Sequence, residues 1–328
     1  MHKCFNKVMK YIKNKYSTES LLIGVSGGQD SICLIRFINN FNTKQKKYKH
    51  IDYIYIDHQW TKESKKQAEY VISYLKSLKN KVTIYQIRKT SLSEKIARTY
   101  RYHTIIHHAI KYKYKVILTA HTETDKIETF FLNLIRGTTI EGTTTLGLCR
   151  MINQKIVLAR PLIYTTRQYI KFTCRRYFLP LWSDSSNYNY SIKRNRVRNE
   201  LIPYLRKYYN KKLESNMIGF LSNCKYNNEY IKKKVINLYL QNKHKKYIAL
   251  NYKYLKKQHS IIQVRVMQIF LCHSINLFVD KSKLTDLISK LYQVKNEKYF
   301  RLILKNINVL YVGQWIFLSY SESTSLNK

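Results

Sequence analysis

The stretch Ser26–Ser31, with the sequence SGGQDS, decides the fold of this chain. It follows the apolar run 21–25 (LLIGV), and apolar residues recur after it at helical spacing from Ile32 to Phe41. This pattern predicts a buried strand, a glycine turn and the first turn of a helix. The first turn of a helix presents unpaired N–H groups and the positive end of the helix dipole. The segment therefore predicts an anion site.

The residue types of this turn suit a phosphate group. Gly27 and Gly28 would let a phosphate approach the backbone and would tolerate positive φ. Ser26 and Ser31 can add hydroxyl donors, and Asp30 can hold a metal ion that shields phosphate charge. A serine-capped turn without a ligand is the simpler alternative, but strand, turn, helix and Asp30 together favour a nucleotide site. The turn lacks the Lys-Ser or Lys-Thr pair of the Walker P-loop and the third glycine of the dinucleotide fingerprint.

The charge of the chain points to a polyanionic partner. Its 328 residues carry 60 Lys and Arg against 19 Asp and Glu, a formal net charge of +41. An aromatic content of 14% argues against a disordered basic tail. Phosphate groups would neutralise this positive charge, and the release of counterions would drive binding, so we expect a nucleic acid as the partner. Mutational drift in an AT-rich genome is the alternative, and it explains thirty Tyr against eight Gly but not the shortage of acids.

The cysteines and the N-terminus exclude several other classes. The six cysteines contain no Cys-x-x-Cys pair, so a zinc site, an iron–sulfur cluster and a disulfide framework are not expected. No apolar run has membrane-spanning length. The N-terminus lacks the apolar core of a signal peptide. It predicts an amphipathic helix whose apolar face is formed by Phe5, Val8, Met9 and Ile12.

Strand and helix patterns alternate after the glycine turn. Strands are predicted at 51–56, 82–87 and 116–120, and helices at 62–78 and 94–112. This rhythm predicts an α/β fold, a doubly wound, Rossmann-like parallel sheet with helices on both faces. Ligands bind beyond the carboxyl ends of such strands. Three strand ends carry polar groups there: the turn 26–31, Asp57-His58, and His121 with Asp125.

The rest of the chain predicts a second domain. A short strand pair is expected within 146–163, and a loop at 183–187. Residues 194–198 lead into a helix near Pro203, and the pattern from 207 onward is mostly helical. Two β-like runs, 300–304 and 309–318, end the chain. We place the domains at 1–206 and 207–328, the second being smaller and mainly helical.

Two carboxylates stand close together in a chain that has few of them. Asp125 and Glu128 lie near the start of a predicted helix, and their spacing puts them on one face with His121 just before. Compensation of the helix dipole is the alternative reading. Beside a nucleotide site, the pair predicts a clamp for an amine-bearing substrate or Mg²⁺. Arg98 and Arg101, on the preceding helix, can reach phosphate oxygens, with a solvated basic face as the alternative.

Several segments together resemble one family, the tRNA(Ile)-lysidine synthetases of the N-type ATP pyrophosphatase (PP-loop) superfamily. The matching segments are SGGQDS (26–31), DH (57–58), ARTYRY (97–102), HTETDKIETFFLNLIRG (121–137), ARPL (159–162), SDSSN (183–187), RNRVRNELIPYL (194–205) and the helical stretch 248–271. The loop alone is shared with GMP synthetases, argininosuccinate synthetases and tRNA thiolases. The joint occurrence of the other segments is more selective.

The resemblance implies a ligase that forms lysidine, with a PP-loop catalytic domain at 1–206 and a tRNA-binding domain at 207–328. ATP would adenylate the C2 oxygen of the wobble cytidine in tRNA(Ile) with the anticodon CAU, releasing pyrophosphate. The amine of free L-lysine would then attack C2 and expel AMP, changing decoding from AUG to AUA. The alternatives are a PP-loop tRNA sulfurtransferase and a non-catalytic tRNA-binding protein.

The resemblance also implies roles for individual residues. Those expected to bind ATP are Ser26, Gly27, Gly28, Gln29, Asp30, Ser31, Asp57 and His58, with Asp30 also holding Mg²⁺. The expected catalytic residues are Asp30, Asp125, Glu128 and Arg194, of which Asp125 and Glu128 would receive lysine. Contacts to phosphate or tRNA are expected from Arg98, Arg101, His121 and Arg198.

Two positions depart from the family pattern. Thr61 replaces an arginine often found three residues after His58, and Thr124 replaces the first of two consecutive aspartates. The second departure leaves one carboxylate fewer at the site. The single aspartate and the sequence 58–60 (HQW) look like those of cyanobacterial members. With the AT-biased composition and no transit peptide, we expect a plastid-encoded protein of the chloroplast stroma, the alternative being a bacterial cytoplasm. Oligomeric state stays open, a homodimer being one option.

Overall fold

The computed structural model describes residues 2–57, 64–78, 80–87, 94–144, 146–181, 188–293, 299–304 and 307–320. The chain divides into two compact units, Met1–Ser222 and Asn223–Lys328. Each unit has its own sheet and its own hydrophobic core. Within the described ranges, no helix is both long and apolar enough to span a bilayer.

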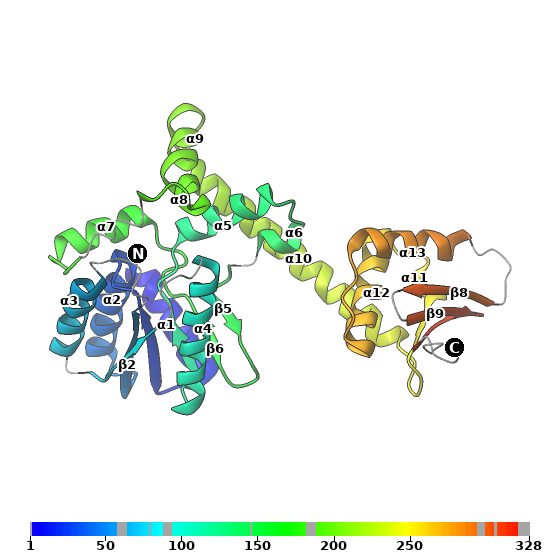
Figure 1. Ribbon diagram of the computed structural model, residues 1–328, viewed down its shortest axis with the longest axis horizontal. Helices are drawn as coiled ribbons and strands as arrows, with labels where there is room; N and C mark the ends of the chain where they lie inside the picture. The colour runs from blue at the N-terminus through cyan, green and yellow to red at the C-terminus, as the bar shows by residue number, and fades with distance from the viewer. Residues whose placement is uncertain are drawn as a thin grey trace, which may run out of the picture. The chain divides into compact units, whose positions relative to one another are not determined.

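The first unit is built on a six-stranded sheet (Figure 1). Its strands are β1 (Ser20–Val25), β2 (His50–Asp57), β3 (Val82–Gln86), β4 (Val116–Leu118), β5 (Cys149–Met151) and β6 (Val157–Ala159), in the order β3-β2-β1-β4-β6-β5. All neighbouring pairs are parallel except β5 with β6, which is antiparallel. The predicted doubly wound parallel sheet is confirmed, and the strand pair expected within 146–163 is β5 and β6.

Helices cover both faces of this sheet because its central strands are apolar on both sides. Along β1, Leu21, Ile23 and Val25 join one core cluster, and Leu22 joins another. The first cluster also contains residues of α1 (His2–Tyr16), α2 (Gln29–Gln45), α3 (Ser64–Ser77) and α7 (Arg167–Arg176). The second contains residues of α4 (Glu94–Lys111). Phe5, Val8, Met9 and Ile12 of α1 are buried, which confirms the predicted amphipathic helix.

The remaining helices of the first unit lie near the carboxyl ends of the strands (Figure 1). They are α5 (Glu123–Ile135), α6 (Ile140–Thr143), α8 (Lys193–Arg196), η2 (Val197–Leu201) and α9 (Ile202–Tyr208). The last three follow one another without a break, and η2 is one turn of π-helix. Beta strand β4 ends at Leu118, two residues earlier than predicted, so Thr119 and Ala120 belong to the loop that leads into the site.

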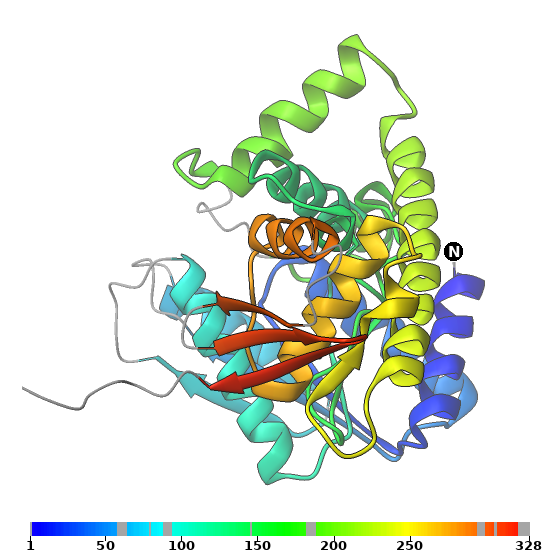
Figure 2. The same ribbon diagram turned by 90° about the vertical axis from the view of Figure 1, so that its right-hand side faces the viewer.

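The second unit combines helices with a small antiparallel sheet (Figure 2). Its elements after α10 (Leu213–Asn242) are β7 (Ala249–Asn251), α11 (Tyr252–Leu255), α12 (Ser260–Ile275), α13 (Lys281–Gln293), β8 (Tyr299–Leu304), β9 (Ile307–Val312) and β10 (Trp315–Tyr320), with sheet order β7-β10-β9-β8. Helices α12 and α13 share its core with β9 and β10. The predicted run 309–318 is therefore two strands, joined by a turn in which Gly313 has φ +61°.

The boundary between the two compact units falls between Ser222 and Asn223, within α10, whereas the sequence places it at 206/207. The difference has a packing cause. Leu213, Met217 and Ile218, at the start of α10, pack against a small core of the first unit that includes Val197 and Ile202. Helical periodicity continues through this region, and it does not reveal which core a helix contacts.

Candidate functional site

The glycine turn between β1 and α2 has the shape of an anion cradle, and one glycine is essential to it. Gly27 has φ +77°, and a Cβ there would lie 2.8 Å from Cγ2 of Val71. Gly28 has an ordinary φ of −74°, so positive φ is required at one of the two glycines only. A Cβ at Gly28 would meet only Oγ of Ser26, at 3.6 Å. Gly28 therefore keeps the approach to the helix end open.

The first turn of α2 is presented without a side-chain cap. Its N-cap residue is Gly28, which makes no side-chain hydrogen bond. The hydroxyl of Ser31 donates to the carbonyl oxygen of Gly28 at 2.8 Å, and Oγ of Ser26 lies 3.4 Å from Oγ of Ser31. The N-terminal N–H groups and the helix dipole thus face the turn together with two hydroxyls, as predicted for a phosphate site.

Asp30 has an unsatisfied oxygen in this loop. Its Oδ1 atom is buried and has no hydrogen-bond partner among the described residues, and neither has Nε2 of Gln29. Burial raises the pKa of Asp30 to about 6. Arg167 and Arg198 oppose this rise, while Asp125 and Glu128 add to it. A buried carboxylate oxygen without a donor is a fitting ligand for a hard cation such as Mg²⁺.

The surroundings of Asp30 suit magnesium bound together with phosphates. Among the described residues, no three His, Cys, Asp or Glu side chains gather as a metal cage. Mg²⁺ commonly binds through one or two carboxylates, with substrate phosphates and water completing its shell. One carboxylate beside an uncapped helix end matches this mode.

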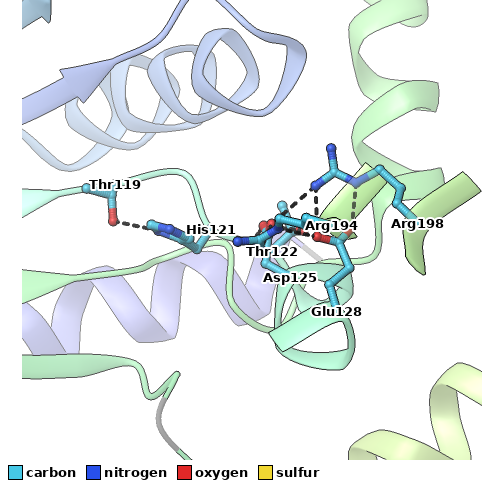
Figure 3. Close-up of polar contacts among 7 residues, drawn as sticks. All are labelled: Thr119, His121, Thr122, Asp125, Glu128, Arg194 and Arg198. Carbon is cyan, nitrogen blue, oxygen red and sulfur yellow. Dashed lines mark hydrogen bonds and ion pairs between the residues drawn. The ribbon is translucent and has the colours of Figure 1, made fainter. Parts of the chain in front are cut away.

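A second group of residues lies beside the loop, and we call it the acid–arginine cluster: Asp125, Glu128, Arg194 and Arg198 (Figure 3). Arg194 donates from Nε to Glu128 Oε2 at 2.7 Å and from Nη2 to Asp125 Oδ1 at 2.9 Å. Arg198 donates from Nε to Glu128 Oε1 at 2.5 Å and from Nη2 to Glu128 Oε2 at 2.9 Å. The Glu128 side chain is 0% exposed, so a fully buried carboxylate is held by two guanidinium groups.

Asp125 is held on its other side by the start of α5. Its Oδ2 accepts hydrogen bonds from the backbone N–H of Thr122 at 2.8 Å and from the Thr122 hydroxyl at 3.0 Å. Burial disfavours the charge of Asp125, but Arg194, the Thr122 N–H and Arg198 outweigh it and lower the pKa of this carboxyl. Asp125 is therefore ionised at neutral pH. Its carboxylate accepts hydrogen bonds both from the N-terminus of α5 and from an arginine of the cluster.

The two arginines reach the cluster from one continuous helical segment. Arg194 lies on α8 and Arg198 on the π-turn η2. Val197 and Ile202 of this segment form a core with Ile127 of α5, which fixes the segment beside the two acids. π-Helical turns occur frequently at functional sites, where they redirect side chains.

His121 lies at the edge of the cluster as a neutral ring. Its Nδ1 lies 3.0 Å from the Thr119 hydroxyl oxygen (Figure 3). Burial lowers the pKa of His121, and the charges of Arg160, Arg98 and Arg194 lower it further, although Asp125 opposes them. A neutral imidazole can offer a hydrogen bond but no charge, so His121 does not add to the cationic groups here.

The other predicted residues fall on the same sheet edge or outside the described residues. Asp57 ends β2 and is buried. His58 and Thr61 lie outside the described residues, as does the loop 183–187. Arg98 and Arg101 lie on α4 and are half-buried. The charge of Arg98 acts on His121, which places this residue near the cluster.

Two cations were missed by the sequence reasoning. Arg160 directly follows β6, is 4% exposed, and donates from Nη1 to the carbonyl oxygen of Gly147 at 2.8 Å. Its charge acts on His121, and that of Arg167, at the start of α7, acts on Asp30. An arginine immediately after an apolar strand, at the carboxyl edge of a parallel sheet, was the available signal. Together with the cluster they make this edge suitable for a polyphosphate.

Comparison with known proteins agrees with this geometry. Residues 1–205 match the family model described as a PP-loop domain. The chloroplastic tRNA(Ile)-lysidine synthase of Gracilaria tenuistipitata var. liui is 41% identical over 318 residues, which cover 97% of this chain and 98% of that protein. The protein of the same name from Pyropia yezoensis is 32% identical over 327 residues, covering 97% and 95%.

A solved structure shares the fold. The tRNA thiolase from Methanococcus maripaludis, solved with its iron–sulfur cluster, aligns with a TM-score of 0.55 at 13% identity and covers 67% of this chain and 77% of that one. At this identity the likeness concerns the fold alone. The sequence relatives, which span nearly the whole chain, confirm the resemblance drawn from the motifs: this chain belongs to the tRNA(Ile)-lysidine synthase family of PP-loop proteins.

Proposed function

We propose that this protein is an ATP-dependent ligase that joins L-lysine to C2 of the wobble cytidine in tRNA(Ile) with the anticodon CAU. The observation that carries the proposal is an uncapped helix end with an unpartnered Oδ1 of Asp30, beside a cluster of two acids and two arginines. The family to which the chain belongs supports the choice of substrate.

In the first step, the loop positions ATP for attack by the C2 oxygen on the α-phosphorus. The N–H groups of the first turn of α2, with the hydroxyls of Ser26 and Ser31, bind the phosphate oxygens and orient pyrophosphate as the leaving group. Asp57, at the neighbouring strand end, lies toward the adenosine. Asp30 would hold Mg²⁺, which when bound would neutralise part of the phosphate charge. Preorganised donors of this kind stabilise charge without reorganisation during the reaction.

In the second step, the neutral lysine amine forms a bond to C2, the bond between C2 and the adenylated oxygen breaks, AMP leaves, and the amine loses a proton to solvent. Lysine brings both ammonium and carboxylate groups, and the acid–arginine cluster offers a counterpart for each. The lowered pKa of Asp125 keeps this carboxylate charged, so it suits holding an ammonium group better than removing its proton. Arg194 and Arg198 bond to the two acids through Nε and Nη2, and their remaining N–H groups suit the carboxylate of lysine.

The charge of the whole chain suits the larger substrate. A formal net charge of +41 attracts the tRNA backbone and accelerates encounter. Chloroplastic relatives support the plastid as the compartment, with the stroma as the expected location.

The direct test is lysine transfer. Purified protein is incubated with Mg²⁺, ATP, radiolabelled lysine and unmodified tRNA(Ile)(CAU), and the digested nucleosides are analysed by mass spectrometry. We expect label in tRNA only with ATP, AMP as the product, and a cytidine heavier by lysine less water.

A parallel reaction with a sulfur donor in place of lysine addresses the sulfurtransferase alternative. Replacement of an oxygen by sulfur would favour that alternative. A well-folded protein that binds the tRNA but modifies it in neither reaction would support the non-catalytic one.

A further inference from the structure

Three exposed tyrosine rings lie at the end of α9, where Tyr204 contacts both of the others, and we call them the tyrosine platform: Tyr204, Tyr208 and Tyr209. They are 53%, 63% and 73% exposed. The ring centroids of Tyr204 and Tyr208 lie 4.9 Å apart, and those of Tyr204 and Tyr209 lie 6.1 Å apart. Helix α9 stands clear of the sheet of the first unit (Figure 1).

The platform differs from the other aromatic contacts of the chain. With thirty tyrosines in the sequence, single exposed rings need no explanation. Every other ring contact recorded between described residues includes a buried or half-buried ring. Those contacts belong to packing. The platform contributes to no core cluster, so packing does not account for it.

The charged groups around the platform indicate which kind of partner it binds. Nζ of Lys207 lies 4.9 Å from the centroid of Tyr208, and Lys211 and Lys212 follow in the exposed turn. The nearby carboxylate of Glu214 is already bonded to Arg206. Flat exposed rings among cations, with the local acid neutralised, are the features that bind single-stranded nucleic acid by base stacking and phosphate contact.

The tyrosine platform lies close to the acid–arginine cluster along the same helical segment. It lies on the helical segment that carries Arg198, six to eleven residues further on. At 1.5 Å per helical residue this is about 9–17 Å along the axis. Nucleotides rise about 3.4 Å each when stacked, so the distance corresponds to about three to five of them. A nucleotide at the acid–arginine cluster would therefore have near neighbours within reach of the rings.

We propose that the tyrosine platform stacks unpaired anticodon-loop nucleotides of the tRNA while the target cytidine lies at the acid–arginine cluster. The inference rests on the proposed function for the identity of the RNA. It adds a binding surface on a part of the molecule outside the phosphate loop and the cluster.

The test compares ring removal with hydroxyl removal. Affinity for unmodified tRNA(Ile)(CAU) is measured by filter binding without ATP or lysine, for Tyr208→Leu/Tyr209→Leu, Tyr208→Phe/Tyr209→Phe and the single variant Tyr209→Leu. Stacking of one base on one ring increases the affinity about fivefold or more. We expect a loss of about tenfold or more for the double Leu variant, about fivefold for Tyr209→Leu, and less than twofold for the Phe variant.

A matched control and the salt dependence complete the design. Tyr11 is 45% exposed and has Nζ of Lys15 5.3 Å from its centroid, so Tyr11→Leu removes a similar ring–lysine pair from another helix. We expect this variant to bind like the wild type. The slope of affinity against salt should be unchanged in all variants, because no phosphate contact is removed.

The proposal would be overturned by full affinity in the Leu variants, by an equal loss in the Phe variant, or by an equal loss in Tyr11→Leu. Dissociation of a dimer with tRNA affinity retained would assign the rings to a protein contact and also reject it. Because binding is measured without catalysis, failure of lysine transfer in the wild type is seen separately from failure of this inference.

Discussion

The phosphate loop (Ser26–Ser31) and the acid–arginine cluster both contain buried carboxylates, but these carboxylates differ in their hydrogen bonding. In the loop, Oδ1 of Asp30 has no hydrogen-bond partner among the described residues. In the cluster, Glu128 accepts three hydrogen bonds from two arginines, and both oxygens of Asp125 are bonded. The first arrangement lowers the stability of the free protein, whereas the second contributes to the fold itself.

This contrast separates two kinds of functional residue. An unsatisfied group is ready for a ligand that brings the missing partner, so its removal should affect the reaction more than the fold. A satisfied group holds neighbouring elements together, so its removal should affect both. Substitutions in the two regions test this distinction.

The largest effect on stability is expected for Glu128→Ala. Removing this carboxylate leaves the half-buried Arg194 and Arg198 to share the single charge of Asp125, and breaking a buried ion pair costs about 3–5 kcal/mol. Denaturant unfolding should show this loss, together with loss of AMP formation. The control is Glu200→Ala, whose exposed pair with Arg196 is worth less than about 1 kcal/mol. Similar small losses in both variants would show that the cluster does not stabilise α5 and η2.

A smaller loss is expected for Gly27→Ala in the loop. Gly27 and Gly137 have almost the same φ, +77° and +76°, so alanine brings the same backbone strain of about 1–2 kcal/mol at each. Only at Gly27 does the new Cβ approach another side chain, Cγ2 of Val71 at 2.8 Å. Gly27→Ala should therefore lose about 1 kcal/mol or more beyond Gly137→Ala in thermal unfolding. Equal losses would mean that the loop has room for the methyl group.

Asp30→Asn should change stability in the opposite direction. The folded-state pKa of Asp30, about 6, exceeds the ordinary value of 3.8, so the folded protein loses stability as pH rises from about 4 to about 6. Above pH 6 the ionised carboxylate costs about 1–3 kcal/mol, which Asn avoids. We expect a higher melting temperature at pH 8 without ligand, and no AMP formation. A lower melting temperature with retained activity would contradict the role given to Asp30.

The smallest effect concerns pH. Protonated Asp30 cannot hold a cation, so the affinity for Mg²⁺-ATP should be full above pH 6 and should fall as pH drops through about 6. Isothermal titration calorimetry from pH 5 to pH 8 measures this change. Asp30→Asn should bind weakly with little pH dependence over that range. A wild-type profile as flat as that of the variant would exclude Asp30 as the titrating group.

The two regions also differ in how far the sequence predicts them. The loop is local: strand, glycine turn and helix are contiguous, and Gly27 to Ser31 lie where the pattern places them. The cluster is not local, because Arg194 and Arg198 meet Glu128 across 66 and 70 residues. Sequence spacing pairs Asp125 with Glu128 on one helix face, but it does not reveal which cations close the site.

Other features stayed beyond prediction for similar reasons. The unpartnered state of Asp30 depends on the packing of α7 and the cluster around it, which no motif encodes. The π-turn that carries Arg198 reads as an ordinary helix in the sequence. In the second unit, strand alternation continues through Gly313, so the pattern predicts one strand where a hairpin forms.

The central claim is that the loop binds the phosphates while the cluster keeps its internal hydrogen bonds. A crystal structure with Mg²⁺ and a non-hydrolysable ATP analogue tests this claim most directly. We predict the phosphates over Gly27, Gly28 and the first turn of α2, Mg²⁺ on Asp30, and intact hydrogen bonds between Arg194 and Glu128. Phosphates bound instead by Arg194 and Arg198, with the loop Ser26–Ser31 free of ligand, would contradict the account.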